Sequence, residues 1–317
     1  MEYRKLINFG NTSLVVSIPK EWTTLHKLKK GDFVYLDQAP ESITLFPREK
    51  DEKREEREYT IDVDGAVIET VKRRAITAYI DNYDSILFTG KNLIKKSQEI
   101  RDILTKNFIA MEIVEESANK IIARSFVNIK DINLDHNLRR ADNMIRTMIK
   151  DLITMKGLSK EKKSALKDSL EVRDKDVNKM VFLSYRFIHF LFTEKKTWNK
   201  QEPIKLLQNW YLFNNLERLG NDAKRIARLL VEVSKKDPLN ELNAILLRVE
   251  KIYEGTMHAF YTDNNPEAYK LSLERTPLLS DCDALIEQNK QNSTMIKIYE
   301  KIKQFVSNIQ NIMRLRY

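Results

Sequence analysis

The sequence contains few residues that end helices. Its 317 residues include only 7 glycines and 7 prolines, whereas ordinary usage is about 7% and 5%. Because few tight turns can form, the composition disfavours an all-β sandwich or barrel and favours long helices. We therefore expect a mainly α protein.

Cysteine and long apolar runs are also scarce. The one cysteine, Cys282, excludes an intramolecular disulfide framework and a zinc site made of cysteines. This cysteine usage suits the reducing cytoplasm. No apolar stretch of signal-peptide length follows residues 1–5, and the most apolar segment, 180–192, is interrupted by Ser184, Arg186 and His189. We expect a cytoplasmic protein that is not inserted in a membrane.

Motifs for catalysis are missing. The seven glycines are scattered, so they form no Walker-type loop, dinucleotide fingerprint or nucleophile elbow. The four histidines are isolated from one another and show no carboxylate–histidine metal spacing. Cys282 has no cluster of basic residues near it that would activate its thiol. We expect that the protein is not an enzyme.

Positive charge is in excess. The chain has 55 lysines and arginines against 46 aspartates and glutamates, which gives a net charge of +9. This excess permits a polyanionic partner such as nucleic acid. Only Glu2 and Glu21 oppose the basic residues of the first 30 positions, which are Arg4, Lys5, Lys20, Lys27, Lys29 and Lys30.

The helix-breaking residues divide the chain. Five of them lie in the first 47 residues, where we expect a small domain, 1–48, with the element order β-β-α-β-β. The elements expected there are strands at 3–8, 13–18, 33–37 and 43–46 and a helix at 20–26. So few residues bury too little surface to be stable alone, and we expect two copies to share one core.

Three further parts follow the first domain. Residues 49–58 carry mixed charge and no apolar side chain, which predicts a solvated linker. In residues 59–130 the spacing of apolar side chains alternates between that of strands and that of helices, which predicts a small α/β segment. The expected strands are 59–63, 85–88, 112–114 and 121–126, and the expected helices are 66–80 and 93–108. Residues 131–317 predict a bundle of six antiparallel helices, of which 268–288 is one.

Ordered sequence marks in the first 48 residues carry a family resemblance. They are a turn of small polar residues at 10–12, the run Ile18-Pro19-Lys20, the segment LKKGD at 28–32 and a closing strand into Pro47. This set resembles the AbrB/MazE/SpoVT swapped-hairpin domain. The resemblance implies an interlaced homodimer that binds DNA through basic residues on strands and loops. The matching positions here are Arg4 and Lys5, with Asn11, Thr12, Ser13 and Lys20 as further candidates.

The helical part resembles a second family. Residues 216–223, LERLGNDA, and residues 171–178, EVRDKDVN, resemble signatures of PhoU proteins, which are bundles of repeated helix triplets. A chain that joins both modules resembles the archaeal-type AbrB-PhoU phosphate uptake regulators. The PhoU resemblance covers about 130–317 and implies partners such as phosphate transporters and signalling kinases.

The PhoU resemblance also implies a metal site. In that family acidic residues four positions apart share a helix face and bind metal, because side chains at i and i+4 converge. Here Asp174 is followed four residues later by Asn178, and Glu217 by Asn221. An amide offers a carbonyl oxygen without negative charge. Two interpretations therefore stay open: a metal ion held by Asp174 and Glu217, or a polar network of all four residues that fixes the helix register.

Two functions follow from these observations. The first is a dimeric DNA-binding transcriptional regulator linked to phosphate homeostasis, with the bundle as sensor or docking module. The alternative is an adaptor that regulates a phosphate transporter or kinase by protein contacts, with the hairpin domain serving only to dimerise.

Overall fold

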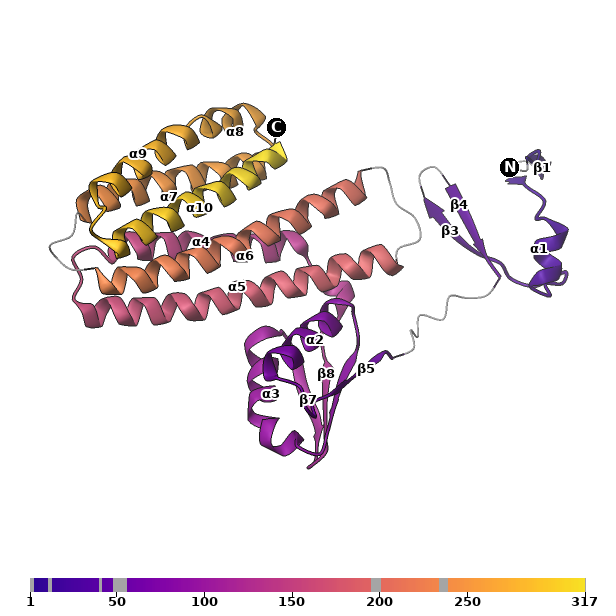
Figure 1. Cartoon of the computed structure of the whole chain (residues 1–317). Coiled ribbons are helices and arrows are strands. Elements are labelled where there is room, and N and C mark those ends of the chain that lie inside the picture. Colours follow the sequence, from indigo (N-terminus) through magenta and orange to yellow (C-terminus); the bar gives the residue numbers. More distant parts are fainter. Residues whose placement is uncertain are drawn as a thin grey trace. The chain divides into compact units, whose positions relative to one another are not determined.

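The computed structural model describes residues 3–10, 13–39, 42–47, 56–194, 201–233 and 239–316. The chain forms two units, Met1–Glu55 and Glu56–Tyr317 (Figure 1). None of the described helices is long and apolar enough to cross a membrane.

The N-terminal unit consists of two small hairpins and one short helix. β1 (Ile7–Phe9) pairs antiparallel with β2 (Ser13–Val15), and β3 (Tyr35–Ala39) pairs antiparallel with β4 (Ser42–Phe46). α1 (Lys20–Leu25) lies between the hairpins in sequence. The element order matches the expected β-β-α-β-β. β1 and β2 are shorter than expected, because their ladder ends at the pair Ile7 and Val15.

A single copy of this unit has no core. No residue of positions 3–47 whose burial is described is buried. Large apolar side chains lie open to solvent instead, with exposed fractions of 92% for Tyr3, 83% for Phe33 and 70% for Phe9. Leu14, Leu36 and Ile43 are each more than 60% exposed. The unit therefore leaves uncovered the side chains that would normally form its interior.

The second unit begins with a four-stranded sheet. Its strands are β5 (Glu58–Asp62), β6 (Ser85–Thr89), β7 (Met111–Glu116) and β8 (Lys120–Ser125), in the order β5-β6-β8-β7. β5 and β6 are parallel, whereas β8 runs antiparallel to both of its neighbours. The parallel pair is joined through α2 (Ile68–Ile80), and α3 (Leu93–Asn107) follows β6.

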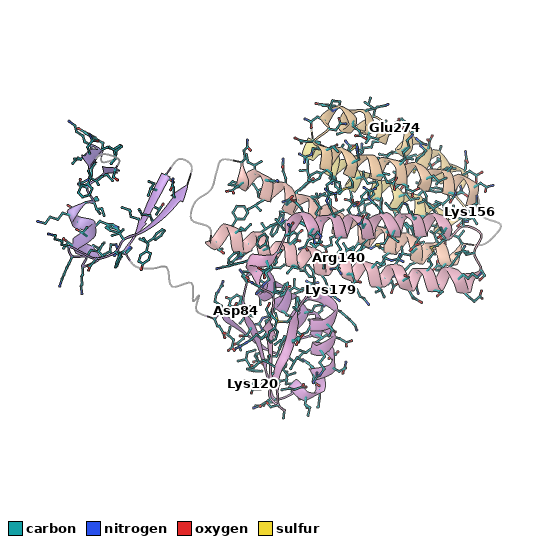
Figure 2. All side chains as sticks on the ribbon, turned by 180° about the vertical axis from the view of Figure 1, so that it is seen from behind. Asp84, Lys120, Arg140, Lys156, Lys179 and Glu274 are labelled. Carbon is teal, nitrogen blue, oxygen red and sulfur yellow. The ribbon has the colours of Figure 1, made fainter. Side chains whose placement is uncertain are left out.

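The helices α2 and α3 complete the core of this α/β layer. Ile61, Ile86 and Phe88 from the strands and Val71 and Tyr79 from α2 are fully buried in it. Figure 2 shows Lys120 at the end of the sheet that lies away from the helical bundle and Asp84 at the end nearer to it.

The helical bundle follows a short 3₁₀ turn, η1 (Ile129–Asp131). Its helices are α4 (Leu134–Thr154), α5 (Lys160–Glu194), α6 (Glu202–Glu232), α7 (Leu239–Thr262), α8 (Asn265–Ser272), α9 (Arg275–Gln288) and α10 (Ser293–Met313), ending in η2 (Arg314–Arg316). Three of these helices, α4, α8 and α10, begin with an asparagine cap, at Asn133, Asn264 and Asn292. In each case the side-chain oxygen accepts a hydrogen bond from a backbone N–H of the first turn.

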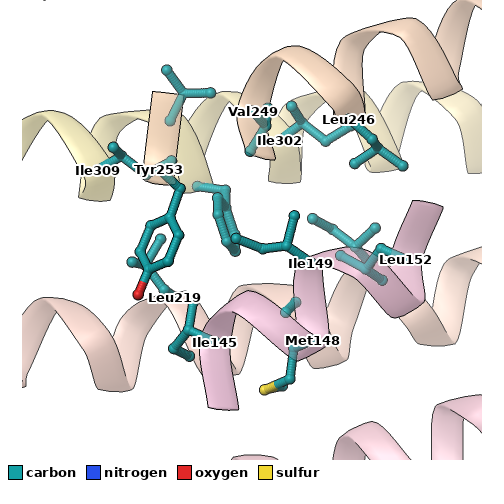
Figure 3. Close-up of a cluster of buried hydrophobic side chains, with 14 of the residues drawn as sticks. Ile145, Met148, Ile149, Leu152, Leu219, Leu246, Val249, Tyr253, Ile302 and Ile309 are labelled. Atoms are coloured by element: carbon teal, nitrogen blue, oxygen red, sulfur yellow. The ribbon is translucent and has the colours of Figure 1, made fainter. Parts of the chain in front are cut away.

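Apolar side chains from several helices meet in one core (Figure 3). Ile145 and Ile149 of α4 pack with Leu219 of α6, Tyr253 of α7 and Ile309 of α10, and all five are buried. The apolar stripes with helical spacing that the sequence shows are thus the faces turned to the core. The mainly α fold with a small β-rich N-terminal unit, expected from the sequence, is confirmed.

One expected helix is wrong. Residues 268–288 form parts of two helices, α8 and α9, with a break at Leu273 and Glu274. The described part of the bundle therefore has seven helices where six were expected. Pro277 explains the break, because proline has no N–H to donate to the carbonyl of Leu273 and its ring would clash with that carbonyl.

The helix α5 belongs to both cores of the second unit. Val181 and Tyr185 pack into the bundle core, whereas Leu183 packs into the core of the α/β layer. Arg186 lies just beyond and is only 2% exposed. Its Nη1 donates to the carbonyl oxygens of Tyr79 at 2.7 Å and Tyr83 at 3.0 Å. This buried arginine fastens α5 to the end of α2.

Candidate functional site

The basic residues of the N-terminal unit lie on its surface. Arg4 and Lys5 lie three and two residues before the start of β1 at Ile7, and both are exposed. Arg4 reaches across to the other side of the hairpin, where its Nη1 donates to Ser17 Oγ at 3.0 Å. Ser13, the first residue of β2, and Lys20, the first of α1, are exposed as well. Asn11 and Thr12 lie outside the described residues.

Further cations surround the turn after α1. Lys27, Lys29 and Lys30 are exposed, and Lys27 adopts a left-handed backbone with φ of 53°. The backbone N–H of Lys29 donates to Asp32 Oδ2 at 2.7 Å, which fixes the turn. Among the residues up to position 47 whose side chains are described, six are basic and two, Glu21 and Asp32, are acidic. This surface is therefore positive, as a phosphate backbone requires.

The predicted metal residues come together between α5 and α6. We call Asp174 and Asn178 of α5 and Glu217, Asn221 and Lys224 of α6 the α5–α6 polar cluster. Lys224 Nζ lies 2.5 Å from Asp174 Oδ2 and donates to Asn221 Oδ1 at 2.9 Å. The side chain of Asp174 is 4% exposed and that of Lys224 is 17% exposed. An ion pair at the cluster is thus largely withdrawn from water.

Glu217 lies close enough to Asp174 for their carboxyl groups to interact electrostatically. Burial raises the pKa of the Glu217 carboxyl, the negative charge of Asp174 raises it further, and Arg218 and Lys224 oppose the shift. Two acceptor oxygens of the cluster, Asp174 Oδ1 and Asn178 Oδ1, are buried without a hydrogen-bond partner among the described residues. Gly220 allows α6 to approach, because a Cβ there would stand 3.4 Å from Asp174 Oδ1.

The α5–α6 polar cluster does not fit a zinc or iron ion. Such ions are held by three or more histidine, cysteine or carboxylate ligands, and no group of this kind occurs in the part of the chain that the structure describes. The cluster offers two carboxylates and two amides, and the Lys224 ammonium already contacts Asp174 and Asn221. The contacts are those of a polar network between two helices.

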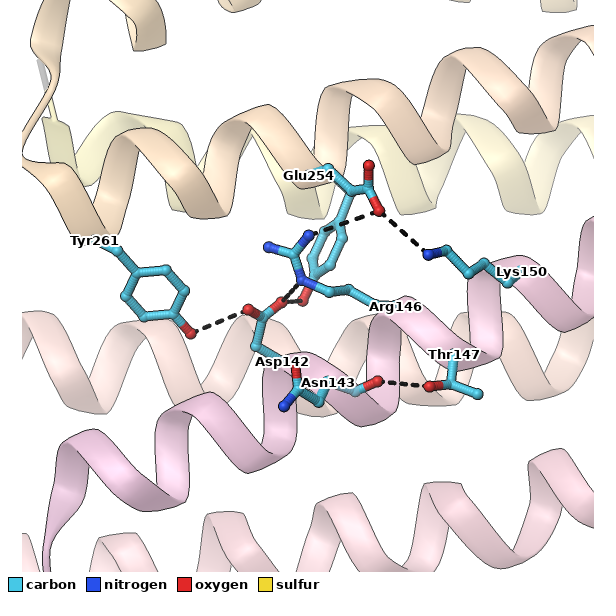
Figure 4. A network of polar contacts seen from close by, with 8 residues as sticks. Asp142, Asn143, Arg146, Thr147, Lys150, Glu254 and Tyr261 are labelled. Atoms are coloured by element: carbon cyan, nitrogen blue, oxygen red, sulfur yellow. Dashed lines mark hydrogen bonds and ion pairs between the residues drawn. The ribbon is translucent and has the colours of Figure 1, made fainter.

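A second polar site lies between α4 and α7 (Figure 4). Asp142 of α4 is 3% exposed and accepts three hydrogen bonds. The donors are Tyr253 Oη at 2.8 Å, Tyr261 Oη at 3.1 Å and Arg146 Nε at 2.9 Å. Arg146 also lies 3.7 Å from Glu254, which Lys150 approaches to 3.6 Å. The carboxylate of Asp142 is therefore held in place from both helices.

An open cleft of about 720 Å³ exposes one side of this network. Arg139 lies at its edge, with its guanidinium 4.4 Å from the centre of the Tyr261 ring. Burial and the nearby Asp142 charge raise the pKa of Tyr253 and Tyr261 well above the usual value for tyrosine. Both phenols hence remain donors at neutral pH.

The local sequence pattern does not reveal this network. The available signal was Asp142 itself, which occupies a core position in a stripe formed by Leu138, Ile145 and Ile149. A charged residue on the buried face of a helix needs a partner inside the protein. The identity of its tyrosine partners, more than 100 positions later, has no local signal.

The single cysteine shows no sign of activation. Cys282 of α9 is fully buried, and burial raises the pKa of its thiol to about 12. At neutral pH the thiol is therefore protonated and a poor nucleophile.

The buried Asp222 of α6 gives a pH-dependent prediction. It accepts a hydrogen bond from Asn308 Nδ2 at 2.9 Å, and burial raises the pKa of its carboxyl. Because the folded pKa exceeds the unfolded one, stability falls as pH rises from about 4 towards the folded pKa. We expect Asp222→Asn to match the wild type at acidic pH and to exceed it at neutral pH. The gain is about 1.4 kcal/mol for each pH unit between the unfolded and the folded pKa.

The free energy of unfolding, measured by urea titration across this pH range, tests the Asp222 prediction. A difference between Asp222→Asn and the wild type that stays constant with pH would contradict it.

Comparison with known proteins gives little further identification. The sequence matches no protein-family model and no curated protein. Among solved structures, the chain is similar to the crystal structure of PhoU from Pseudomonas aeruginosa, with 14% sequence identity and a TM-score of 0.47. The match covers 57% of this chain and 88% of that one. A likeness of this strength assigns no family.

Proposed function

We propose that this chain is a homodimeric DNA-binding regulator whose helical bundle responds to a signal linked to phosphate supply. The observation that carries the proposal is the N-terminal unit, which combines a coreless pair of hairpins with an exposed basic surface. The sequence marks at 10–12, 18–20 and 28–32 support it as an ordered set that resembles the swapped-hairpin DNA-binding family.

The exposed apolar side chains support a dimer. Tyr3, Phe9, Leu14 and Phe33 are each more than 60% exposed in one copy. Two interlaced copies would place such side chains in a shared interior, and burial of apolar surface yields about 25 cal/mol per Å². A dimer would thus supply the core that a single copy lacks.

The basic surface supports DNA as the partner. Arg4 and Lys5 stand next to a strand edge, and Arg4 is oriented by Ser17 of the same hairpin. Arginine and lysine neutralise phosphates, while short polar side chains such as Ser13 can reach base edges. Two copies would double these contacts along one duplex.

The link to phosphate rests on the second resemblance. Residues 216–223 and 171–178 fall on α6 and α5, where they contribute Glu217, Asn221, Asp174 and Asn178 to the α5–α6 polar cluster. In this proposal the bundle is the part that senses the signal or docks a partner, and the protein acts in the cytoplasm.

The double variant Arg4→Ala/Lys5→Ala tests the proposal. Each phosphate contact contributes about 0.9 to the slope of log K against log salt concentration. A dimer that loses two contacts per copy is expected to bind weaker and to lose about 3 to 4 from that slope. Fluorescence anisotropy titrations of promoter fragments selected from genomic DNA measure both quantities.

The matched control removes the same charge from the bundle. Lys270 and Lys297 are exposed on α8 and α10, and Lys270→Ala/Lys297→Ala should leave the slope unchanged. Equal binding by the wild type and Arg4→Ala/Lys5→Ala at every salt concentration would remove these residues from the interface.

One observation favours the alternative function, an adaptor that acts through protein contacts. Ile204, Leu207 and Tyr211 follow the i, i+3, i+7 spacing along α6 and are 59%, 61% and 40% exposed. A stripe of this kind is the face that one helix presents to another. A wild-type protein that dimerises but selects no DNA fragment would favour this adaptor.

A further inference from the structure

We propose that the ammonium group of Lys224 is the built-in cation of the α5–α6 polar cluster, so that the cluster binds no metal ion unless this lysine is removed. The inference concerns the bundle alone and does not depend on DNA binding.

The position of Lys224 follows from the helix period. It lies three residues after Asn221 and seven after Glu217, so the three side chains share one face of α6. This face meets Asp174 of α5, and Asn178 follows four residues later on the same face of that helix. The ammonium therefore enters the place where the carboxylates and amides of both helices converge, with Asp174 Oδ2 and Asn221 Oδ1 as its observed contacts.

The lysine supplies the positive charge beside the most buried carboxylate of the cluster. Asp174 and Glu217 bring two carboxyl groups, and the Lys224 ammonium forms its ion pair with Asp174, whose side chain is 4% exposed. One ammonium then suffices to neutralise the buried Asp174. A divalent cation would have to share this small volume with the ammonium, and two like charges at such a distance repel strongly in a partly dry interior.

The oxygens around Lys224 would form a ligand set for a hard cation if the ammonium were absent. Asp174 Oδ1 and Asn178 Oδ1 are already buried without hydrogen-bond partners among the described residues. Removal of the lysine would free Asp174 Oδ2 and Asn221 Oδ1 as well. Carboxylate and amide oxygens in this number suit Mn²⁺ or Mg²⁺.

The test compares Mn²⁺ binding by the full-length wild type and by Lys224→Ala. The six-line electron paramagnetic resonance signal of free Mn²⁺ disappears when the ion binds, so its amplitude gives the bound fraction. We expect Lys224→Ala to bind one Mn²⁺ per chain more than the wild type does. Its melting temperature should fall without the ion and recover when Mn²⁺ is added, whereas that of the wild type should not respond to Mn²⁺ or to a chelator.

Two further variants show where the ion binds. Lys179→Ala also removes a lysine, but from an ion pair with Asp176 on the surface of α5, where Figure 2 labels Lys179. It should bind Mn²⁺ as the wild type does. Adding Asp174→Asn to Lys224→Ala should abolish the gained binding, because it removes the central carboxylate.

Two outcomes would overturn the inference. One is a folded Lys224→Ala protein that gains no Mn²⁺. The other is a wild type whose Mn²⁺ binding is lost in Asp174→Asn, since the lysine would then not exclude the ion. The wild-type comparison stands even if Lys224→Ala does not fold, and folding of that variant only in the presence of Mn²⁺ would support the inference.

Discussion

Replacement of Arg186 by methionine is expected to lower the free energy of unfolding by about 3 kcal/mol or more. The guanidinium is buried and donates to the carbonyls of Tyr79 and Tyr83, and hydrogen bonds to charged groups contribute about 1.5–3 kcal/mol each. Its carbon atom Cζ also lies 4.8 Å from the centre of the Tyr79 ring. Methionine fills similar space but leaves both carbonyls without these donors.

Urea denaturation followed by circular dichroism measures the Arg186 effect, and hydrogen exchange locates it. The amides of α2 should exchange faster than in the wild type, because α2 loses its attachment to α5. Arg228→Met is the matched control, since Arg228 pairs with Glu171 while 55% exposed and such pairs contribute about 0–1 kcal/mol. Equal losses in the two variants would contradict the role of Arg186.

The second large effect is expected for Asp142→Ala, which should cost about 3–5 kcal/mol, as found when one partner of a buried charged pair is removed. The substitution leaves Arg146 without its buried carboxylate and Tyr253 Oη without its acceptor. Tyr261 Oη, which is less deeply placed, can find water in the open cleft. The loss should therefore come mainly from the two deeper donors.

Thermal and urea unfolding of Asp142→Ala check this expectation against Asp283→Ala. Asp283 pairs with Lys303 but its side chain is 59% exposed, so its loss should be less than about 1 kcal/mol. A double-mutant cycle with Tyr253→Phe isolates the tyrosine contribution, and additive losses would show that Asp142 and Tyr253 are not coupled.

Elements with a strong local period were predictable from the sequence. Both helices of the α/β layer, expected at 66–80 and 93–108, occur at Ile68–Ile80 and Leu93–Asn107. Its strands appear within a few residues of the expected positions. One face of each of these elements is buried, and the residues on that face are apolar. The spacing of apolar residues along the sequence therefore reveals the type of element directly.

The break between α8 and α9 required attention to a single residue. The apolar spacing of 268–288 continues across Leu273 and Glu274, so the period alone predicts one helix. Pro277 contradicted that prediction, because its missing N–H acts four residues upstream. A rule applied to prolines within otherwise periodic segments would have found the break.

Contacts between distant segments had no signal in the local pattern. Arg186 was visible only as a charge that interrupts an apolar segment, and its acceptors Tyr79 and Tyr83 lie more than 100 positions earlier. Nothing distinguished Lys224 from the other lysines and arginines, 55 in all, although it lies one helical turn after Asn221. The helix period places Lys224 on the face of Glu217, but only the packing of α5 on α6 places it against Asp174.

The length of α5 has a mechanical consequence. Its 35 residues, Lys160–Glu194, contain no glycine or proline, so it is a continuous rod of roughly 50 Å without a hinge. Near one end Lys163 donates to the carbonyl of Val233, and near the other Arg186 donates to the carbonyls of Tyr79 in the last turn of α2 and Tyr83 just after it. A continuous helix with contacts near both ends transmits a displacement of one end to the other. Any event in the bundle that tilts α5 will therefore also move the α/β layer.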